Sequence, residues 1–361
     1  MKKNMQMGIT ILVIIILLCV GIITYKIYRD KKEYNKLNKN EETNNVITIN
    51  IDKEEKIKTV ETFKGNDRPI AVMIDNHKKA LPQGGLNDAY MVYEIIVEGG
   101  ESRLMALFKG DKVDKIGPVR SARHYFLDYA LENDAIYTHF GWSPQAENDI
   151  KKLGVNNING IFESEKSFWR TKDKYAPHNV ATSTENILQI AERKDYKTKS
   201  NKESVLKYVT EEVNLENGEK ADNVTIPYSD YNKVKYTYNP ETKRYQRFSK
   251  GVEEVDWSTK ENVTTKNIII TFARNTTLND GENKDRQNLH NIGKLDGYYI
   301  TNGKAIKITC EKTSRTSKTI YRDLEGNEIK VNDGNTFVQI CPIDAKVKIE
   351  ANEQENRIDA E

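Results

Sequence analysis

The sequence predicts an N-terminal α/β (or α+β) domain followed by a smaller, mostly β C-terminal domain, with an N-terminal transmembrane helix. Three observations support this fold class. One uncharged apolar run, MGITILVIIILLCVGIITY, lies near the start of the chain. Strand patterns then alternate with helical patterns to about residue 195, and beyond residue 223 only alternating strand patterns remain. The 361 residues suffice for two domains with cores of their own.

The apolar run covers residues 7–25, close to the ~20 residues that cross a bilayer as a helix. It lacks the small-residue cleavage site of a signal peptide, which favours an uncleaved anchor in residues 1–25. A lipid-modified Cys19 is the weaker alternative, because the preceding IILL lacks the expected small residue. Basic residues flank the run on both sides, and their count alone would leave the large domain inside the cell. The short N-terminal tail favours outward placement instead.

The bulk charge excludes several partners and cofactors. There are 56 basic and 54 acidic residues, so the net charge of +2 gives no general attraction to nucleic acid. The sequence has no phosphate-binding glycine loop and no Cys/His spacing of a metal site. We therefore expect no nucleic-acid partner, no metal and no other cofactor. Cys310 and Cys341 could form one disulfide in an exported domain or remain buried thiols.

Composition and periodicity predict the domain boundaries. We expect an anchor at 1–25, a flexible tether at 26–62, an α/β domain at 63–195, a charge-rich, helix-biased connector at 196–222, a β domain at 223–345 and a polar tail at 346–361. In the α/β domain, strands are predicted at Ile70–Ile74, 90–98, 102–108 and 135–139. Helices are predicted to begin near Ser121, to cover about 145–153, and to begin at a capping box of Thr182 and Glu185.

Charged side chains gather after the second predicted strand. Glu94, Glu98 and Glu101 lie at or near its end, and Arg103 follows. Arg120 and Arg123 flank Ser121, where a helix N-terminus would favour anions rather than cations. Either the glutamates neutralise the arginines within the protein, or both kinds of group surround a polar ligand.

Further polar residues follow predicted strands, where α/β folds bind ligands. These candidate ligand-binding residues are Asn76, His77, Glu94, Arg103, Arg120, Ser121, Arg123, His139, Trp142, Ser143, His178 and Asn179, with Glu98, Glu101 and Asp75 as candidate catalytic carboxyls. Glu98 is either a general acid or an ion-pair partner. Trp142 and Trp169 could stack on sugar rings or serve only in packing. His139 and Ser143 lack the motif of a nucleophile pair.

Several long motifs resemble a known family. RPIAVMIDNH, PQGGLNDAYMVYEIIVEGGESRLMALF, IGPVRSARHYFLDYA and APHNV, with NGKAIKITCEK and GNTFVQICP downstream, are similar to the YerB-like envelope proteins of Gram-positive bacteria. These contain a two-part domain of unknown function numbered 3048. The resemblance implies an exported, membrane-tethered protein and supplies no reaction. Family members are often lipoproteins, and they commonly have Trp-Lys where this chain has Cys310-Glu311.

We therefore expect a single-pass cell-membrane protein with most of the chain outside the cytoplasm, acting on or binding peptidoglycan-type polymer. If it is an enzyme, a peptidoglycan glycosidase or lytic transglycosylase fits best, with Glu98 or Glu101 as the acid and the arginines as an anion clamp. The alternative is a non-catalytic envelope module that recruits or regulates a wall-synthesis or remodelling protein. A third interpretation follows the count of basic residues around the apolar run and places the large domain inside the cell.

Overall fold

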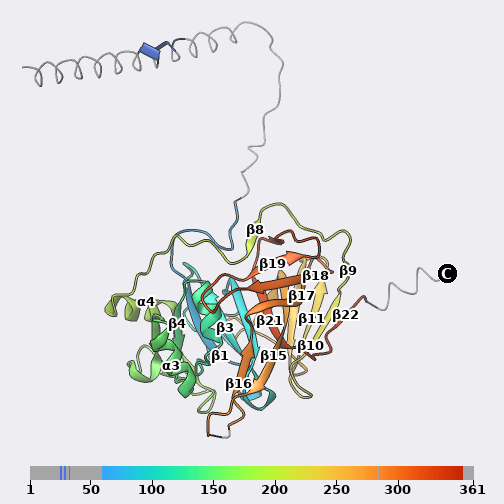
Figure 1. Cartoon of the computed structure of the whole chain (residues 1–361). Helices are drawn as coiled ribbons and strands as arrows, with labels where there is room; N and C mark the ends of the chain where they lie inside the picture. The colour runs from blue at the N-terminus through green and yellow to red at the C-terminus, as the bar shows by residue number, and fades with distance from the viewer. Residues whose placement is uncertain (1–24, 27, 30–31, 33–58, 283, 353–361) are drawn as a thin grey trace, which may run out of the picture. The chain divides into compact units, whose positions relative to one another are not determined.

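The computed structural model describes residues 25–26, 28–29, 32, 59–282 and 284–352 (Figure 1). The predicted anchor, apart from Tyr25, and residues 33–58 of the predicted tether lie outside the described residues. In the part of the chain that is described, no helix is both long enough and apolar enough to span a membrane. The chain divides into two units, residues 1–57 and 58–361, and the second unit carries the fold.

One large mixed sheet of twelve strands runs through the second unit. Ten strands follow the order β19-β18-β17-β15-β21-β2-β3-β1-β4-β5, while β16 pairs with β15 and β9 with β18. Their bounds are β1 Ile70–Asp75, β2 Met91–Ile96, β3 Ser102–Phe108, β4 Ile136–His139, β5 Asn157–Asn159, β9 Glu219–Lys220, β15 Asn267–Thr277, β16 Gln287–His290, β17 Gly293–Thr301, β18 Lys304–Lys312, β19 Ile320–Asp323 and β21 Thr336–Pro342.

A smaller sheet of six strands has the order β13-β12-β11-β10-β22, with β14 paired to β12. Its strands are β10 Asn223–Pro227, β11 Lys233–Asn239, β12 Arg244–Ser249, β13 Val252–Glu253, β14 Thr264–Thr265 and β22 Lys348–Glu350. Two short pairs complete the strands, β8 Lys207–Val209 with β20 Lys330–Asn332, and β6 Trp169–Arg170 with β7 Val180–Ala181. The strand β22 corrects the expected polar tail, because its backbone pairs with β10.

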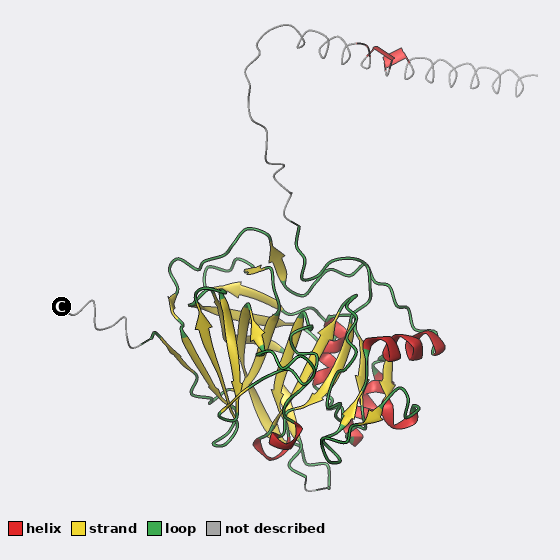
Figure 2. Cartoon of the chain, turned by 180° about the vertical axis from the view of Figure 1, so that it is seen from behind, coloured by secondary structure: helices red, strands yellow, loops and turns green. Residues whose placement is uncertain are grey.

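In the part of the chain that the structure describes, the helices are few and short, and α2, α3 and α4 gather near the end of the large sheet that contains β4 (Figures 1 and 2). They are α2 Phe126–Glu132, α3 Pro144–Lys152 and α4 Thr184–Arg193, with 3-10 turns η1 Lys78–Ala80, η2 Glu98–Gly100 and η3 Gly160–Phe162. The fold is therefore mostly β, with helices packed on only part of the sheet. The connector at 196–222 was expected to favour helix, but its described elements are the strands β8 and β9.

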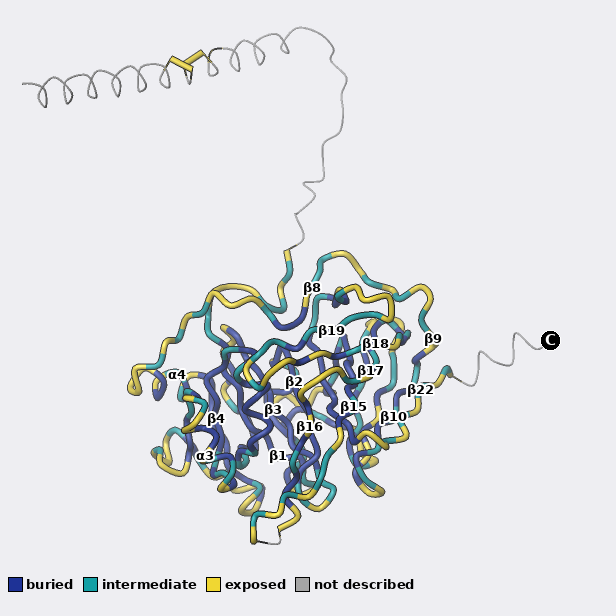
Figure 3. The backbone as a smooth tube through the Cα atoms, viewed as in Figure 1, coloured by how far each residue is buried: buried dark blue, intermediate teal, exposed yellow. Residues whose placement is uncertain are grey.

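Buried residues are concentrated in the strands (Figure 3), and their side chains form a core on each face of the large sheet. Because strand side chains alternate, Val72 and Ile74 of β1 pack on one face and Ala71 and Met73 on the other. The first face packs against α4 and the smaller sheet, whose members of this cluster include Ile187, Ile190, Val224, Ile226, Val234 and Tyr236. The second face packs against α2 and α3, represented by Phe126, Leu127, Ala130, Ala146 and Ile150. Within residues 59–352, the helices α2 and α3, the large sheet, and α4 with the smaller sheet therefore form three layers.

The N-terminal and C-terminal parts of the chain share the large sheet. Strand β21, near the end of the chain, pairs in parallel with β2 on one side and with β15 on the other. The tight hairpin of β2 and β3 turns through Gly99 and Gly100, both with positive φ, as the Gly-Gly pair predicts. Backbone hydrogen bonds between strands therefore join the N-terminal and C-terminal parts into one continuous sheet.

Candidate functional site

Several polar residues of the predicted site meet at one edge of the large sheet. Strands β1 and β4 are parallel, as are β4 and β5, and β2 has the same direction as β1 because both are antiparallel to β3. Their carboxyl ends therefore point to the same edge, which is where open sheets with parallel strands bind ligands. Asp75 ends β1, and Glu98 follows β2 within the η2 turn.

Asp75 is the centre of the first group of polar side chains. Its Oδ2 lies 3.2 Å from Arg120 Nε and 2.8 Å from His178 Nδ1, while its Oδ1 accepts the backbone N–H of His77 at 3.0 Å. The rings of His77 and His178 stack with centroids 4.6 Å apart. Burial raises the pKa of Asp75, but the His178 hydrogen bond and the Arg120 charge outweigh it, and the pKa lies below its usual value. We call Asp75, His77, Arg120 and His178 the Arg120 cluster.

Glu98 is the centre of a second, neighbouring group. Its carboxylate pairs with Arg123 Nε and lies 3.5 Å from Arg103 Nη2. Arg103 also donates to the Ser121 carbonyl at 2.7 Å, and Arg123 donates to the Ala122 carbonyl at 2.7 Å. Burial raises the pKa of Glu98, yet the two guanidiniums bring it below its ordinary value. Burial and the nearby Arg123 lower the pKa of Arg103 to about 10.

The predicted helix cap at Ser121 is wrong. Helix α2 begins only at Phe126, and its N-cap residue Tyr125 makes no side-chain cap bond. The Ser121 hydroxyl instead donates to the Phe140 carbonyl at 3.1 Å, because residues 120–122 run beside the end of β4. Arg120 and Arg123 therefore precede the helix and owe their environment to Asp75 and Glu98, not to a helix dipole.

The three guanidiniums differ in how far the protein covers them. The side chains of Arg103 and Arg123 are 8% and 11% exposed, whereas that of Arg120 is 26% exposed. Within the described part of the chain, Arg120 makes one ion pair, through Nε, and its side chain makes no other hydrogen bond or ion pair. Arg103 and Arg123 share the single carboxylate of Glu98, whereas Arg120 pairs with Asp75 and is the most exposed of the three guanidiniums.

Two other predicted carboxylates contact the C-terminal part. Glu94 is fully buried and pairs with Arg247 of β12 at 2.9 Å, and Arg247 also pairs with Glu254. Glu101 pairs with Lys250 at 2.6 Å. This corrects the expectation that Glu94 contacts a ligand, because its carboxylate is sealed between the two sheets. The sequence gives no signal for Arg247 or Lys250 as partners, since such pairings over long sequence distances leave no local pattern.

Four further predicted residues have structural roles. Asn76 is fully buried and donates to Glu94 Oε1 at 3.0 Å, and His139 is fully buried against the Gly141 carbonyl at 2.8 Å. Ser143 is the N-cap of α3, accepting the Ala146 N–H. Asn179 accepts a hydrogen bond from Arg170 at 2.8 Å. These contacts correct the expectation that Asn76, His139 and Ser143 bind a ligand directly, because each polar group is buried and satisfied inside the protein.

The remaining expectations concern aromatic residues, a helix cap and the cysteines. Trp142 is half-buried between His139, at 5.5 Å between centroids, and exposed Phe162, at 5.9 Å. Helix α4 is capped by Ser183, which accepts the Asn186 N–H, so the predicted cap at Thr182 is wrong by one residue. Cys310 and Cys341 are buried free thiols, so they do not form the disulfide considered above.

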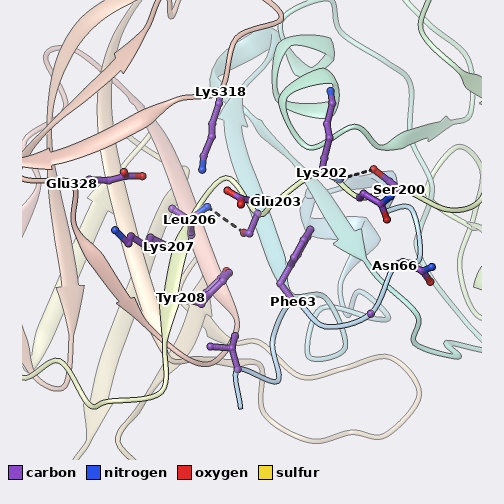
Figure 4. A pocket seen from close by; sticks show the side chains of 14 residues that line it. Phe63, Asn66, Ser200, Lys202, Glu203, Leu206, Lys207, Tyr208, Lys318 and Glu328 are labelled. Carbon is purple, nitrogen blue, oxygen red and sulfur yellow. Dashed lines mark hydrogen bonds between the residues drawn. The ribbon is translucent and has the colours of Figure 1, made fainter. Parts of the chain in front are cut away.

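Two of the cavities in the described part of the chain lie near the Arg120 cluster. A cavity of about 550 Å³ contacts His178 and Lys174, and one of about 500 Å³ lies between Phe140 and Trp169. A third, of about 590 Å³, lies where residues 60–66 meet residues 200–208 (Figure 4). Its lining combines the aromatic rings of Phe63 and Tyr208 with charged side chains. These include Lys202, Lys207, Lys318, Glu203 and Glu328. Among the described residues, no three His, Cys, Asp or Glu side chains are grouped to hold a metal ion.

Comparison with known proteins gives the family. The chain is 33% identical over 286 residues to the "Putative lipoprotein YerB" of Bacillus subtilis (strain 168), covering 76% of this chain and 81% of that protein. It also matches the crystal structure of the Bacillus subtilis YerB protein, with a TM-score of 0.70 and 30% identity over 78% of this chain and 94% of that one. The family models described as the N-terminal and C-terminal domains of a protein of unknown function (DUF3048) match residues 57–197 and 224–338. The chain therefore belongs to the DUF3048 family, which confirms the YerB-like resemblance and the two-domain organisation.

Proposed function

We propose that this protein is a membrane-anchored cell-envelope protein that binds anionic groups of a peptidoglycan-type wall polymer through the Arg120 cluster, without cleaving the polymer. The observation that carries this proposal is the guanidinium of Arg120, which is partly exposed and held by Asp75 through Nε. A guanidinium fixed at one side keeps its Nη donors available for a carboxylate or phosphate, for which its fork geometry is suited. Stacked His77 and His178 stand beside it as further donors.

Placement in the envelope is supported by two observations. Residues 7–25 form an uncharged apolar run of the length that spans a bilayer. The Bacillus subtilis relative is named a lipoprotein, and a lipid attachment would also tether a protein to a membrane. Either attachment holds the domain of residues 59–352 near the wall polymer, where a modest affinity for repeated anionic groups suffices for retention.

Binding is favoured over cleavage because of the carboxylates. A glycosidase needs a general acid whose pKa is raised, so that it is protonated at neutral pH. Glu98 is flanked by Arg103 and Arg123, and the pKa of its carboxyl lies below the ordinary value. Asp75 is likewise held ionised by His178 and Arg120, and Glu101 is occupied by Lys250. These carboxylates therefore stay ionised and paired with cations, which suits them to position basic side chains and not to donate a proton to a glycosidic bond.

Co-sedimentation with purified, insoluble peptidoglycan tests the proposal. We expect wild-type protein to sediment with the polymer, and Arg120→Ala to weaken the apparent affinity on the order of tenfold, since a charge-assisted contact is lost. Arg322→Ala is the matched control, because Arg322 is a partly exposed arginine on β19, at the opposite end of the large sheet from β4 and β5. The same samples are analysed for soluble muropeptides. Equal sedimentation of wild type and Arg120→Ala, or muropeptide release that Glu98→Gln abolishes, would contradict binding without cleavage.

A further inference from the structure

A second recognition feature lies next to the Arg120 cluster. The cavity of about 500 Å³ is lined by Phe140, Gly160, Glu163, Phe168, Trp169 and Arg170, among others. It is contributed by the loop after β4, the η3 turn after β5, and β6. Its volume is within the range of small-molecule sites. Its one sign in the sequence is Trp169, an aromatic residue in a polar segment.

Aromatic rings form one wall of this cavity. The rings of Phe140 and Phe168 lie 6.3 Å apart between centroids, and Trp169 is only partly buried. They close over Gly160, where an added Cβ would lie 2.5 Å from Phe168 Cδ1 and 2.8 Å from Phe140 Cδ2. The glycine is therefore needed for the rings to reach this arrangement. A partly exposed indole beside this wall suits the C–H face of a pyranose ring, which is apolar.

Charged groups in fixed positions form the other part of the lining. Arg170 lies over the Phe140 ring at 5.5 Å and donates through Nη1 to Asn179 at 2.8 Å. Glu163 is held by Arg193 and by Lys194, the latter at 3.9 Å. Arg170 therefore offers an oriented hydrogen-bond donor and Glu163 an oriented acceptor. Together they match hydroxyl and N-acetyl groups, which both donate and accept hydrogen bonds.

The cavity and the Arg120 cluster are connected through the backbone. Phe140 donates its N–H to the Arg120 carbonyl at 3.0 Å. On the other side, Asn179, the partner of Arg170, directly follows His178 in the chain. We propose that the cavity is a subsite for a neutral N-acetylhexosamine ring of a glycan strand, so that an adjacent acidic group meets Arg120. This inference rests on the proposed function and names the sugar part of its ligand.

Isothermal titration calorimetry of the full chain with chitotetraose tests the subsite, because this N-acetylglucosamine oligomer has no carboxylate. We expect wild type to bind, Trp169→Ala to bind more weakly on the order of tenfold or more, and Trp169→Phe to retain binding. Arg120→Ala is expected to bind chitotetraose as wild type does, and Leu324→Ala, an exposed apolar residue in the loop after β19, serves as the control. Circular dichroism melting curves check that each variant folds.

The outcomes separate the two proposals. Chitotetraose binding that Trp169→Ala leaves unchanged, or no binding by wild type, overturns the sugar subsite while leaving the Arg120 sedimentation result standing. Binding of a free wall peptide that is lost in Trp169→Ala also overturns it and assigns the cavity to peptide. If chitotetraose binds through Trp169 but Arg120→Ala has no effect on wall polymer, the anion-binding proposal fails and the sugar subsite remains.

Discussion

His178 Nδ1 lies 2.8 Å from Asp75 Oδ2, the same oxygen that Arg120 Nε approaches to 3.2 Å. One buried carboxylate at the end of β1 thus orients two cationic or donor side chains from different segments of the chain. The side chain of Asp75 is only 5% exposed, so water does not compete for this oxygen as it would at the surface. Asp75 therefore acts as the positioning residue of the Arg120 cluster.

Asp75→Asn is expected to destabilise the fold at neutral pH, by about 1–3 kcal/mol, because Arg120 and His178 lose their charged partner. The pKa of Asp75 lies below its ordinary 3.8 in the folded protein, so its stabilising contribution is present above pH 3.8 and is lost as the pH falls through the folded-state pKa. Urea unfolding at pH 7 and near pH 3 measures the difference. A wild-type advantage that is equal at both pH values would contradict this role.

His139 should make stability fall as the medium becomes acidic. Burial lowers its pKa to about 4 from the ordinary 6.5, so between these values the unfolded chain binds the proton that the folded protein excludes. Stability therefore falls as the pH decreases through this window, by about 2 kcal/mol between pH 7 and pH 5. His139→Gln, whose amide can still reach the Gly141 carbonyl, should flatten this part of the profile. An unchanged slope in this variant would show that His139 is not the responsible group.

The triad of Glu94, Arg247 and Glu254 should hold the two parts of the chain together. All three are buried, and Arg247 also donates to Tyr236 at 2.8 Å. Arg247→Met leaves two buried carboxylates without a cation, which typically costs about 3–5 kcal/mol.

Guanidinium chloride unfolding measures this cost, and the triple variant Glu94→Gln, Arg247→Met, Glu254→Gln is the matched comparison. It should recover much of the loss, because no uncompensated charge remains. A single Arg247→Met substitution that costs less than about 1 kcal/mol would be incompatible with a sealed triad.

Ser143→Ala separates a structural serine from a reactive one. Ser143 accepts the Ala146 N–H at the start of α3, and losing a cap of this kind costs about 1 kcal/mol. We expect a slightly lower melting temperature and unchanged binding to peptidoglycan. Ser143→Asp, which retains a capping oxygen, should restore stability. A loss of polymer binding in Ser143→Ala at unchanged stability would instead make this residue part of the site.

Local patterns in the sequence predicted the elements well where the determining contacts are also local. The strands β1, β2 and β3 and the Gly99-Gly100 turn follow from short-range signals. Ser121 failed as a cap because its hydroxyl is taken by the Phe140 carbonyl of a neighbouring strand end. Arg247 lies in a strand rich in polar residues, where an arginine is expected to face solvent, yet it is fully buried. Only the packing of the smaller sheet on the larger one explains that position.

The sequence predicted which residues belong to the candidate site better than it predicted how they contact one another. The sequence placed Asp75, His77, Arg120 and His178 among the functional candidates, and the structure brings these four together. It could not show that Glu98 is shared by Arg103 and Arg123, because that depends on how residues 120–123 cross the sheet edge. Lys250 and Arg170 were missed for a different reason, because isolated basic residues in polar segments have no distinguishing pattern.

Binding of N-acetylmuramoyl dipeptide, a soluble wall fragment that carries carboxylates, tests the role of Arg120 most directly. Isothermal titration calorimetry would compare wild type, Arg120→Ala and the control Arg322→Ala at low and at physiological salt. We predict a dissociation constant on the order of tenfold weaker in Arg120→Ala alone, with the difference shrinking as salt rises. Equal dissociation constants for wild type and Arg120→Ala would contradict the anion-binding role.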